Sequence, residues 1–156
     1  MHRNERRQID DFLAQHRLAF IGVSRHEKDF TRSLLREFAG RGYEVVPVHP
    51  EATEIEGIPC VRSIRDVSPA VDGALVLTAS KQSAGVVKEC VEAGVPRVWL
   101  YGSVTQGAVS EEAVELCDKS GVPVVAGECP FMFLSGSGGV HSVHRFFRLL
   151  TGRLPR

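Results

Sequence analysis

The chain of 156 residues lacks the loops by which nucleotide-binding proteins are most easily recognised. It contains no G-x-G-x-x-G segment, which excludes the usual dinucleotide fingerprint. It also contains no G-x-x-x-x-G-K-[ST] segment, which excludes a triphosphate P-loop. A nucleotide bound by this chain would therefore be held in another way.

The sequence also lacks features of membrane and nucleic-acid partners. Its longest apolar runs have the length of strands, too short to cross a bilayer. Basic residues are dispersed and the formal net charge is zero, so no basic stripe suggests nucleic-acid binding. The charged segment 1–7 is not followed by an apolar run, so we expect no secretory signal and a cytoplasmic protein.

Cysteine is scarce and no C-x-x-C pair occurs. The four cysteines are far apart, which favours reduced, mostly buried thiols over a zinc site. His141 and His144 have a spacing that can bind metal but lack the glutamate of H-E-x-x-H, so structural histidines are favoured. Ser103 and Cys129 have no identifiable base nearby in the sequence. We therefore assign no metal ligand and no catalytic residue.

What the sequence does contain is a regular alternation of strand and helix patterns. The strand segments are nearly continuously apolar, which indicates parallel strands covered on both faces. Helical patterns follow most of them, and Gly42, Gly94 and Gly121 stand where a helix ends. This pattern predicts one α/β domain over residues 1–156. The five predicted strands are 18–23, 43–48, 73–78, 98–101 and 122–126.

The predicted helices cover the sheet. Apolar residues recur on one face within 29–40, including Phe30, and again within 80–94 and after Ser110. Residues 51–71 are less regular, and we expect a short edge piece near 58–61 and a helical turn near 64–67. Ile9, Phe12 and Leu13 predict an additional N-terminal helix, and residues 140–152 predict a C-terminal one.

Ligands of open parallel sheets bind beyond the carboxyl ends of the strands. After the first strand, Gly22-Val23-Ser24 forms a turn into a helix, an arrangement that favours phosphate. Basic side chains nearby could neutralise an anion. The second strand ends in His49-Pro50, without the acidic residue that usually holds the ribose of a dinucleotide. The other residues at this edge are Arg25, Lys28, Arg32, Thr78, Ala79, Ser80, Lys81, Tyr101 and Gly102.

Five segments together resemble the small stand-alone coenzyme A-binding proteins of bacteria and archaea, related to the nucleotide domain of the succinyl-CoA ligase α subunit. They span about residues 10–135, and they are 20–24, 42–50, 71–76, 98–102 and 127–132. The resemblance implies a Rossmann-like, doubly wound five-stranded parallel sheet of order 3-2-1-4-5. It also implies coenzyme A or an acyl-CoA as the ligand.

The resemblance further implies where the ligand lies. The diphosphate would lie at Gly22, Val23 and Ser24, supported by Thr31 and Arg32 at the start of the following helix. The adenosine would lie near His49-Pro50, where the family usually has Asn-Pro. Thr78, Ser80, Lys81, Tyr101 and Gly102 would flank the ligand, with Tyr101-Gly102 in place of the family's usual glutamine-containing turn.

Three functions stay open at this point. The first is a coenzyme A-binding module, carrier or sensor without a reaction of its own. The second is an NAD(P)-binding redox sensor or oxidoreductase, because related folds bind these cofactors. The third is an interaction protein with a decayed ligand site, which could form a homodimer through its terminal helices.

Overall fold

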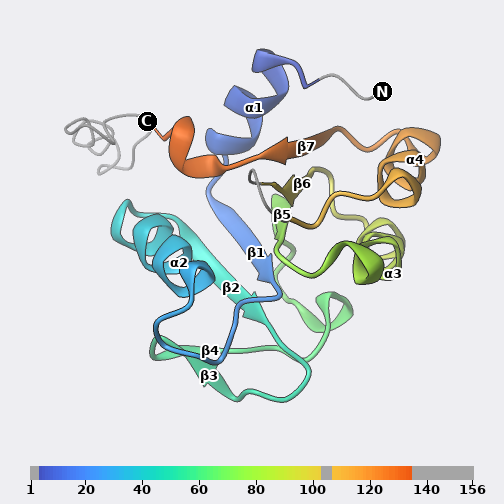
Figure 1. Cartoon of the computed structure of the whole chain (residues 1–156). Coiled ribbons are helices and arrows are strands. Elements are labelled where there is room, and N and C mark those ends of the chain that lie inside the picture. The colour runs from blue at the N-terminus through green and yellow to red at the C-terminus, as the bar shows by residue number, and fades with distance from the viewer. Residues whose placement is uncertain (1–3, 103–106, 135–156) are drawn as a thin grey trace.

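A computed structural model describes residues 4–102 and 107–134 of the chain, as a sheet with helices on both faces (Figure 1). The strands are short and the helices that connect them return the chain to the same end of the sheet. The elements are α1 (Arg6–Leu13), β1 (Arg17–Ile21), α2 (Phe30–Gly40), β2 (Glu44–Val48), β3 (Glu54–Ile55), β4 (Ile58–Pro59), the 3-10 turn η1 (Ile64–Asp66), β5 (Gly73–Val76), α3 (Ser80–Glu92), β6 (Val98–Tyr101), α4 (Glu111–Ser120), β7 (Val124–Glu128) and the 3-10 turn η2 (Pro130–Met132).

The main sheet has the order β2-β1-β5-β6-β7, and every neighbouring pair is parallel. This confirms the predicted Rossmann-like α/β fold. The expected strand order was wrong in one respect, because it put the third predicted strand outside the second. That strand is β5, and it lies beside β1, where all four of its residues are buried. The place outside β2 is taken by a single parallel bridge between Val48 and Val61.

The sheet separates two apolar layers. On one face, α1 and α2 pack through residues such as Phe12, Leu34 and Phe38. On the other face, α3 and α4 pack through Val87 and Cys117 among others. Because both faces are covered, the strands can be apolar along their length, which explains the pattern in the sequence.

The predicted N-terminal helix is confirmed as α1. Phe12 is buried and its ring meets Trp99 of β6 edge-to-face at 5.3 Å between centroids. Before the helix, the Asn4 side chain bonds to the backbone of β7. Its Nδ2 donates to the Ala126 carbonyl at 2.7 Å, and its Oδ1 accepts from the Ala126 amide at 2.7 Å. Asn4 thus pairs with β7 as a neighbouring strand would.

The remaining elements largely agree with expectation. The helix-ending glycines have positive φ values of 98°, 81° and 73° at Gly42, Gly94 and Gly121. Within the expected edge piece 58–61, Ile58–Pro59 form β4, which pairs antiparallel with β3, and Val61 bridges to β2. The turn η1 supplies the predicted helical turn. The expected C-terminal helix over 140–152 lies outside the described residues. Among the helices that are described, none is long and apolar enough to span a membrane.

Candidate functional site

The strand order reverses between β1 and β5, which is the switch point of the sheet. After β1 the chain forms β2 on one side of it, and it later forms β5, β6 and β7 on the other side. The carboxyl ends of β1 and β5 meet closely there, and the Leu77 amide donates to the Ile21 carbonyl at 2.7 Å. Gly22 follows with φ +106°, and a Cβ atom on it would lie 2.9 Å from the carbonyl carbon of Leu77 and the amide nitrogen of Thr78. Only glycine fits this approach.

The turn after Gly22 is held by a chain of hydrogen bonds to the start of α2. The Ser24 amide donates to Thr31 Oγ1 at 2.9 Å, and Thr31 Oγ1 donates to Asp29 Oδ2 at 2.5 Å. Asp29 caps α2 by accepting the Thr31 amide at 2.9 Å. Hydrogen bonds from the Thr31 hydroxyl, then from its amide, lower the pKa of Asp29 against the opposing effect of burial. The His26 amide donates to Ser24 Oγ at 3.0 Å.

These contacts limit how the turn can hold an anion. The amides of Ser24, His26 and Thr31 already have acceptors inside the protein. The carboxylate of Asp29 already faces the positive end of α2. A phosphate at this turn would therefore use other amides and the exposed cations around it.

Arg32 stabilises the turn after Gly22 by hydrogen bonds to the backbone carbonyls of the turn. Its side chain is buried, with Nη1 donating to the carbonyls of Arg25 at 3.0 Å and Ser24 at 3.3 Å. Its Nε pairs with Glu56 at 2.8 Å, and Arg36 shares the same carboxylate at 3.0 Å. The charge of Arg32, which the sequence suggested for phosphate, is already matched by Glu56.

An open cavity of about 590 Å³ lies beside this ion pair, between α2 and the β3–β4 hairpin. Three basic and three acidic side chains line it, so it offers no net charge to an anion. Its lining residues are Glu27, Lys28, Arg32, Arg36, Glu54, Glu56 and Gly57.

Arg25, Lys28 and Lys81 are exposed. Arg25 lies 3.3 Å from Glu51, so an ion pair links the first turn with the end of β2. Surface pairs of this kind stabilise little, and a phosphate could replace the carboxylate as the partner of Arg25.

His49 organises the end of β2. Its Nδ1 accepts the amides of Glu51 at 3.0 Å and Ala52 at 2.9 Å. Both amides thus share one acceptor, the Nδ1 atom of the ring. Asparagine accepts backbone amides in the same way through its side-chain oxygen. Histidine therefore forms this turn through its ring, at a position where asparagine could form it through its amide oxygen.

The ends of β5 and β6 complete the edge. Thr78 Oγ1 lies 3.1 Å from Ser83 Oγ, while Ser80 and Lys81 begin α3 and are exposed. Gly102 is buried where β6 meets the end of β7, and a Cβ on it would lie 2.4 Å from Gly127 Cα. Of the predicted residues, Ser24, Thr31 and Arg32 are joined by hydrogen bonds, and Gly22 lies against the backbone of Thr78. His49 and Pro50 follow β2, which is next to β1, whereas Tyr101 and Gly102 lie at the end of β6, on the far side of β5.

Two aromatic residues at this edge, Phe30 and Phe131, are not among the site residues predicted from the sequence. Phe30 was expected in the helix core, but its side chain is 41 % exposed. Its ring lies 5.6 Å from Tyr101 and 5.5 Å from Phe131. The sequence holds no signal for this position, because the direction of the Phe30 side chain depends on the angle at which α2 leaves the turn.

The part of the chain that the structure describes shows no gathering of three or more potential metal ligands. All four cysteines are unpaired. Burial raises the pKa of both Cys90 and Cys117 to about 12, so these thiols are protonated at neutral pH.

Comparisons with known proteins agree with this geometry. The family model described as CoA binding domain matches residues 16–135, from the start of β1 through η2. The Bacillus subtilis protein YneT is 29 % identical over 113 residues, 72 % of this chain and 81 % of that protein. A solved structure of a conserved hypothetical protein from Pyrococcus furiosus is 32 % identical, with a TM-score of 0.69 over 76 % of this chain and 99 % of the other.

A longer relative is the ADP-forming acetate–CoA ligase II subunit alpha of Pyrococcus furiosus. It is 26 % identical over 130 residues, which is 78 % of this chain. The match covers 28 % of the ligase subunit, so this chain is similar to one part of that protein.

Proposed function

This chain belongs to the CoA binding domain family, and from that premise we propose that it binds coenzyme A or an acyl-CoA at the carboxyl edge of its sheet. The protein acts in this proposal as a binding module, carrier or sensor without a reaction of its own. The close approach of Gly22 to Leu77 and Thr78, within the matched residues, is the observation that carries it. It brings the ends of β1 and β5 together at the switch point of the sheet, which is where ligands of such sheets bind.

The ligand would lie across the strand ends. Its diphosphate would rest at the turn formed by Gly22, Val23 and Ser24, with Arg25 and Lys81 as exposed cations beside it. Its adenosine would lie toward His49-Pro50, whose turn is fixed by the histidine ring. Thr78, Ser80, Tyr101 and Gly102 would flank the remainder. Thr31 and Arg32 would act indirectly, by holding the turn in shape.

The ligase reaction of the longer relative is not carried over, because this chain corresponds to about a quarter of that subunit. We place the protein in the cytoplasm, in keeping with its four unpaired cysteines.

Calorimetric titration with coenzyme A, dephospho-coenzyme A and NADH tests the proposal. We expect micromolar binding of coenzyme A and weaker binding of dephospho-coenzyme A, because the 3′-phosphate adds charge for the exposed cations. Preference for NADH would instead support a redox function. Binding of none of the three, together with concentration-dependent self-association, would favour an interaction protein.

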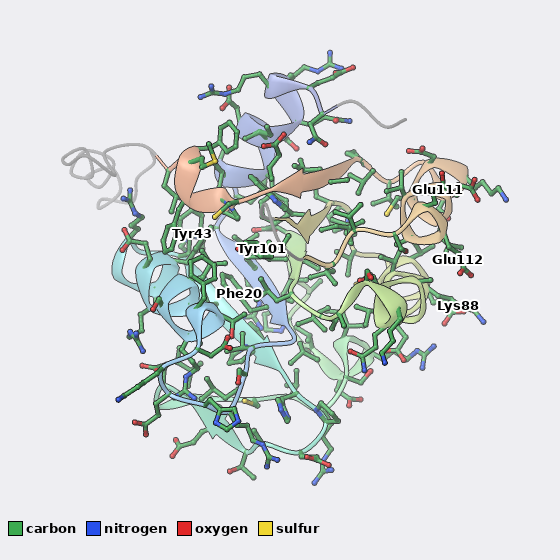
Figure 2. The ribbon with its side chains drawn as sticks, viewed as in Figure 1. Phe20, Tyr43, Lys88, Tyr101, Glu111 and Glu112 are labelled. Atoms are coloured by element: carbon green, nitrogen blue, oxygen red, sulfur yellow. The ribbon has the colours of Figure 1, made fainter. Side chains whose placement is uncertain are left out.

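A pair of matched variants places the site. Lys81 begins α3 at the carboxyl edge, whereas Lys88 is exposed on the same helix and points away from Tyr101 (Figure 2). Lys81→Ala should weaken coenzyme A binding about two- to tenfold, as loss of one partly screened charge pair does. Lys88→Ala should not. Equal effects of the two substitutions would contradict the proposed position.

A further inference from the structure

Three aromatic rings meet at the carboxyl edge, and none belongs to the same element as another. Phe30 comes from the first turn of α2, Tyr101 from the end of β6 and Phe131 from η2. Phe30 stacks at a tilt of 38° on Tyr101 and meets Phe131 edge-to-face at 86°. We call Phe30, Tyr101 and Phe131 the aromatic platform. Phe30 remains 41 % exposed within it, so the platform offers apolar surface to a ligand.

The platform borders the proposed phosphate turn. Phe30 lies between Asp29, which caps α2, and Thr31, which accepts the Ser24 amide. Tyr101 ends β6, two strands from β1 in the sheet order. Neighbouring strands are about 4.8 Å apart, so the end of β6 lies about 10 Å from the end of β1. His49 ends β2, one strand away on the opposite side.

The strand order β2-β1-β5-β6 determines the direction in which a bound coenzyme A would extend across the sheet edge. A coenzyme A whose phosphates rest at β1 and whose adenosine lies toward β2 extends its thiol arm across β5 toward β6. The arm then reaches the aromatic platform. Phe30, as the exposed ring, would lose most contact with water when an acyl chain covers it.

We propose that the aromatic platform binds the acyl group of an acyl-CoA, so that the protein prefers thioesters with an apolar acyl chain over free coenzyme A. This inference rests on the proposed function. Rings favour an alkyl chain over a charged one, because a terminal carboxylate would lose hydration there without gaining a partner. The ligand class is therefore a coenzyme A thioester of an uncharged, aliphatic acid.

Calorimetric titration of the whole protein with coenzyme A, hexanoyl-CoA and succinyl-CoA tests the preference. We expect hexanoyl-CoA to bind at least tenfold more tightly than coenzyme A, since each methylene covered by the rings adds about two- to fourfold. Succinyl-CoA should bind no better than coenzyme A. Phe30→Ala should reduce the hexanoyl-to-free ratio at least fivefold. Met132→Ala, which removes an exposed apolar side chain next to the platform, is the matched control and should leave the ratio as it is.

The outcomes separate this inference from the proposed function. Binding of coenzyme A without preference for hexanoyl-CoA would overturn the acyl assignment and leave the proposed function standing. Binding of none of the three ligands would overturn the proposed function itself. If Phe30→Ala weakens coenzyme A and hexanoyl-CoA by the same factor, the rings bind the adenine instead, and the proposed direction of the ligand is wrong.

Discussion

Removing the hydroxyl of Thr31 should loosen the turn that follows β1. Thr31→Val keeps the shape of the side chain but deletes the acceptor of the Ser24 amide at 2.9 Å and the donor to Asp29 at 2.5 Å. A neutral hydrogen bond contributes about 1 kcal/mol and one to a carboxylate about 1.5 kcal/mol or more. Because both groups are only partly buried, we expect a loss of about 2 kcal/mol, or about thirtyfold in the folded-to-unfolded ratio.

The loss should depend on pH in a defined direction. The Thr31 hydroxyl is the largest cause that lowers the pKa of Asp29 below 3.8. A carboxyl whose folded pKa is lowered contributes stability above its unfolded pKa and loses it as the pH falls through the folded pKa. The difference between wild type and Thr31→Val should therefore be full at pH 7 and shrink below about pH 5.

Urea unfolding followed by circular dichroism at pH 7 and at pH 3 measures both effects. Thr31→Ser is the control, since it keeps the hydroxyl and should lose less than about 1 kcal/mol for its missing methyl group. A Thr31→Val variant as stable as Thr31→Ser would refute the hydrogen-bond account. A difference that grows toward low pH would refute the assignment of the pH dependence to Asp29.

Three further outcomes are expected. Gly22→Ala should lower the free energy of unfolding in urea by at least about 2 kcal/mol, because its Cβ would lie 2.9 Å from backbone atoms at φ +106°. Gly85→Ala, within α3 and with open space around it, should raise the free energy of unfolding by about 0.5–1 kcal/mol. His49→Ala should lower the melting temperature by about 3 °C for each kcal/mol of hydrogen bonding lost by the Glu51 and Ala52 amides. His49→Asn should retain most of the wild-type melting temperature, because an amide oxygen can take the place of Nδ1, and equal melting of the two variants would contradict this role. In labelling with a disulfide reagent at pH 8, at most two of the four thiols should react quickly in the native protein, because burial raises the pKa of Cys90 and Cys117 to about 12. All four should react in urea, and rapid reaction of three or more thiols in the native protein would contradict that burial.

The sequence was sufficient for the strands and helices because burial on both faces leaves a continuous apolar pattern. It was insufficient for their order. Residues 73–76 read equally well as a central or an edge strand, because the pattern records which faces are covered and not which strands are neighbours. The single bridge at Val61 that occupies the place outside β2 is too short to leave any periodicity.

At the candidate site, the sequence predicted residues at the carboxyl edge of the sheet but not the groups to which they bond. Arg32 reads as a free cation next to a phosphate turn, yet Glu56 pairs with it from a hairpin 24 residues later. His49 reads as a departure from the family, although its ring supplies the same kind of acceptor. Whether Phe30 packs inward or toward the strand ends depends on the angle at which α2 leaves the turn, which no local pattern encodes.

The pairing of Asn4 with Ala126 has a consequence for solubility. Among the described residues β7 is the outer strand of the sheet, and an unpaired strand edge invites addition of a strand from another molecule. The Asn4 amide satisfies both backbone groups of Ala126, and it also donates to Glu128 Oε2 at 2.9 Å. One side chain thus occupies both backbone groups of the central residue of β7. Replacing Asn4 by alanine would leave these backbone groups unpaired at the strand edge, where a strand of another molecule could bond to them.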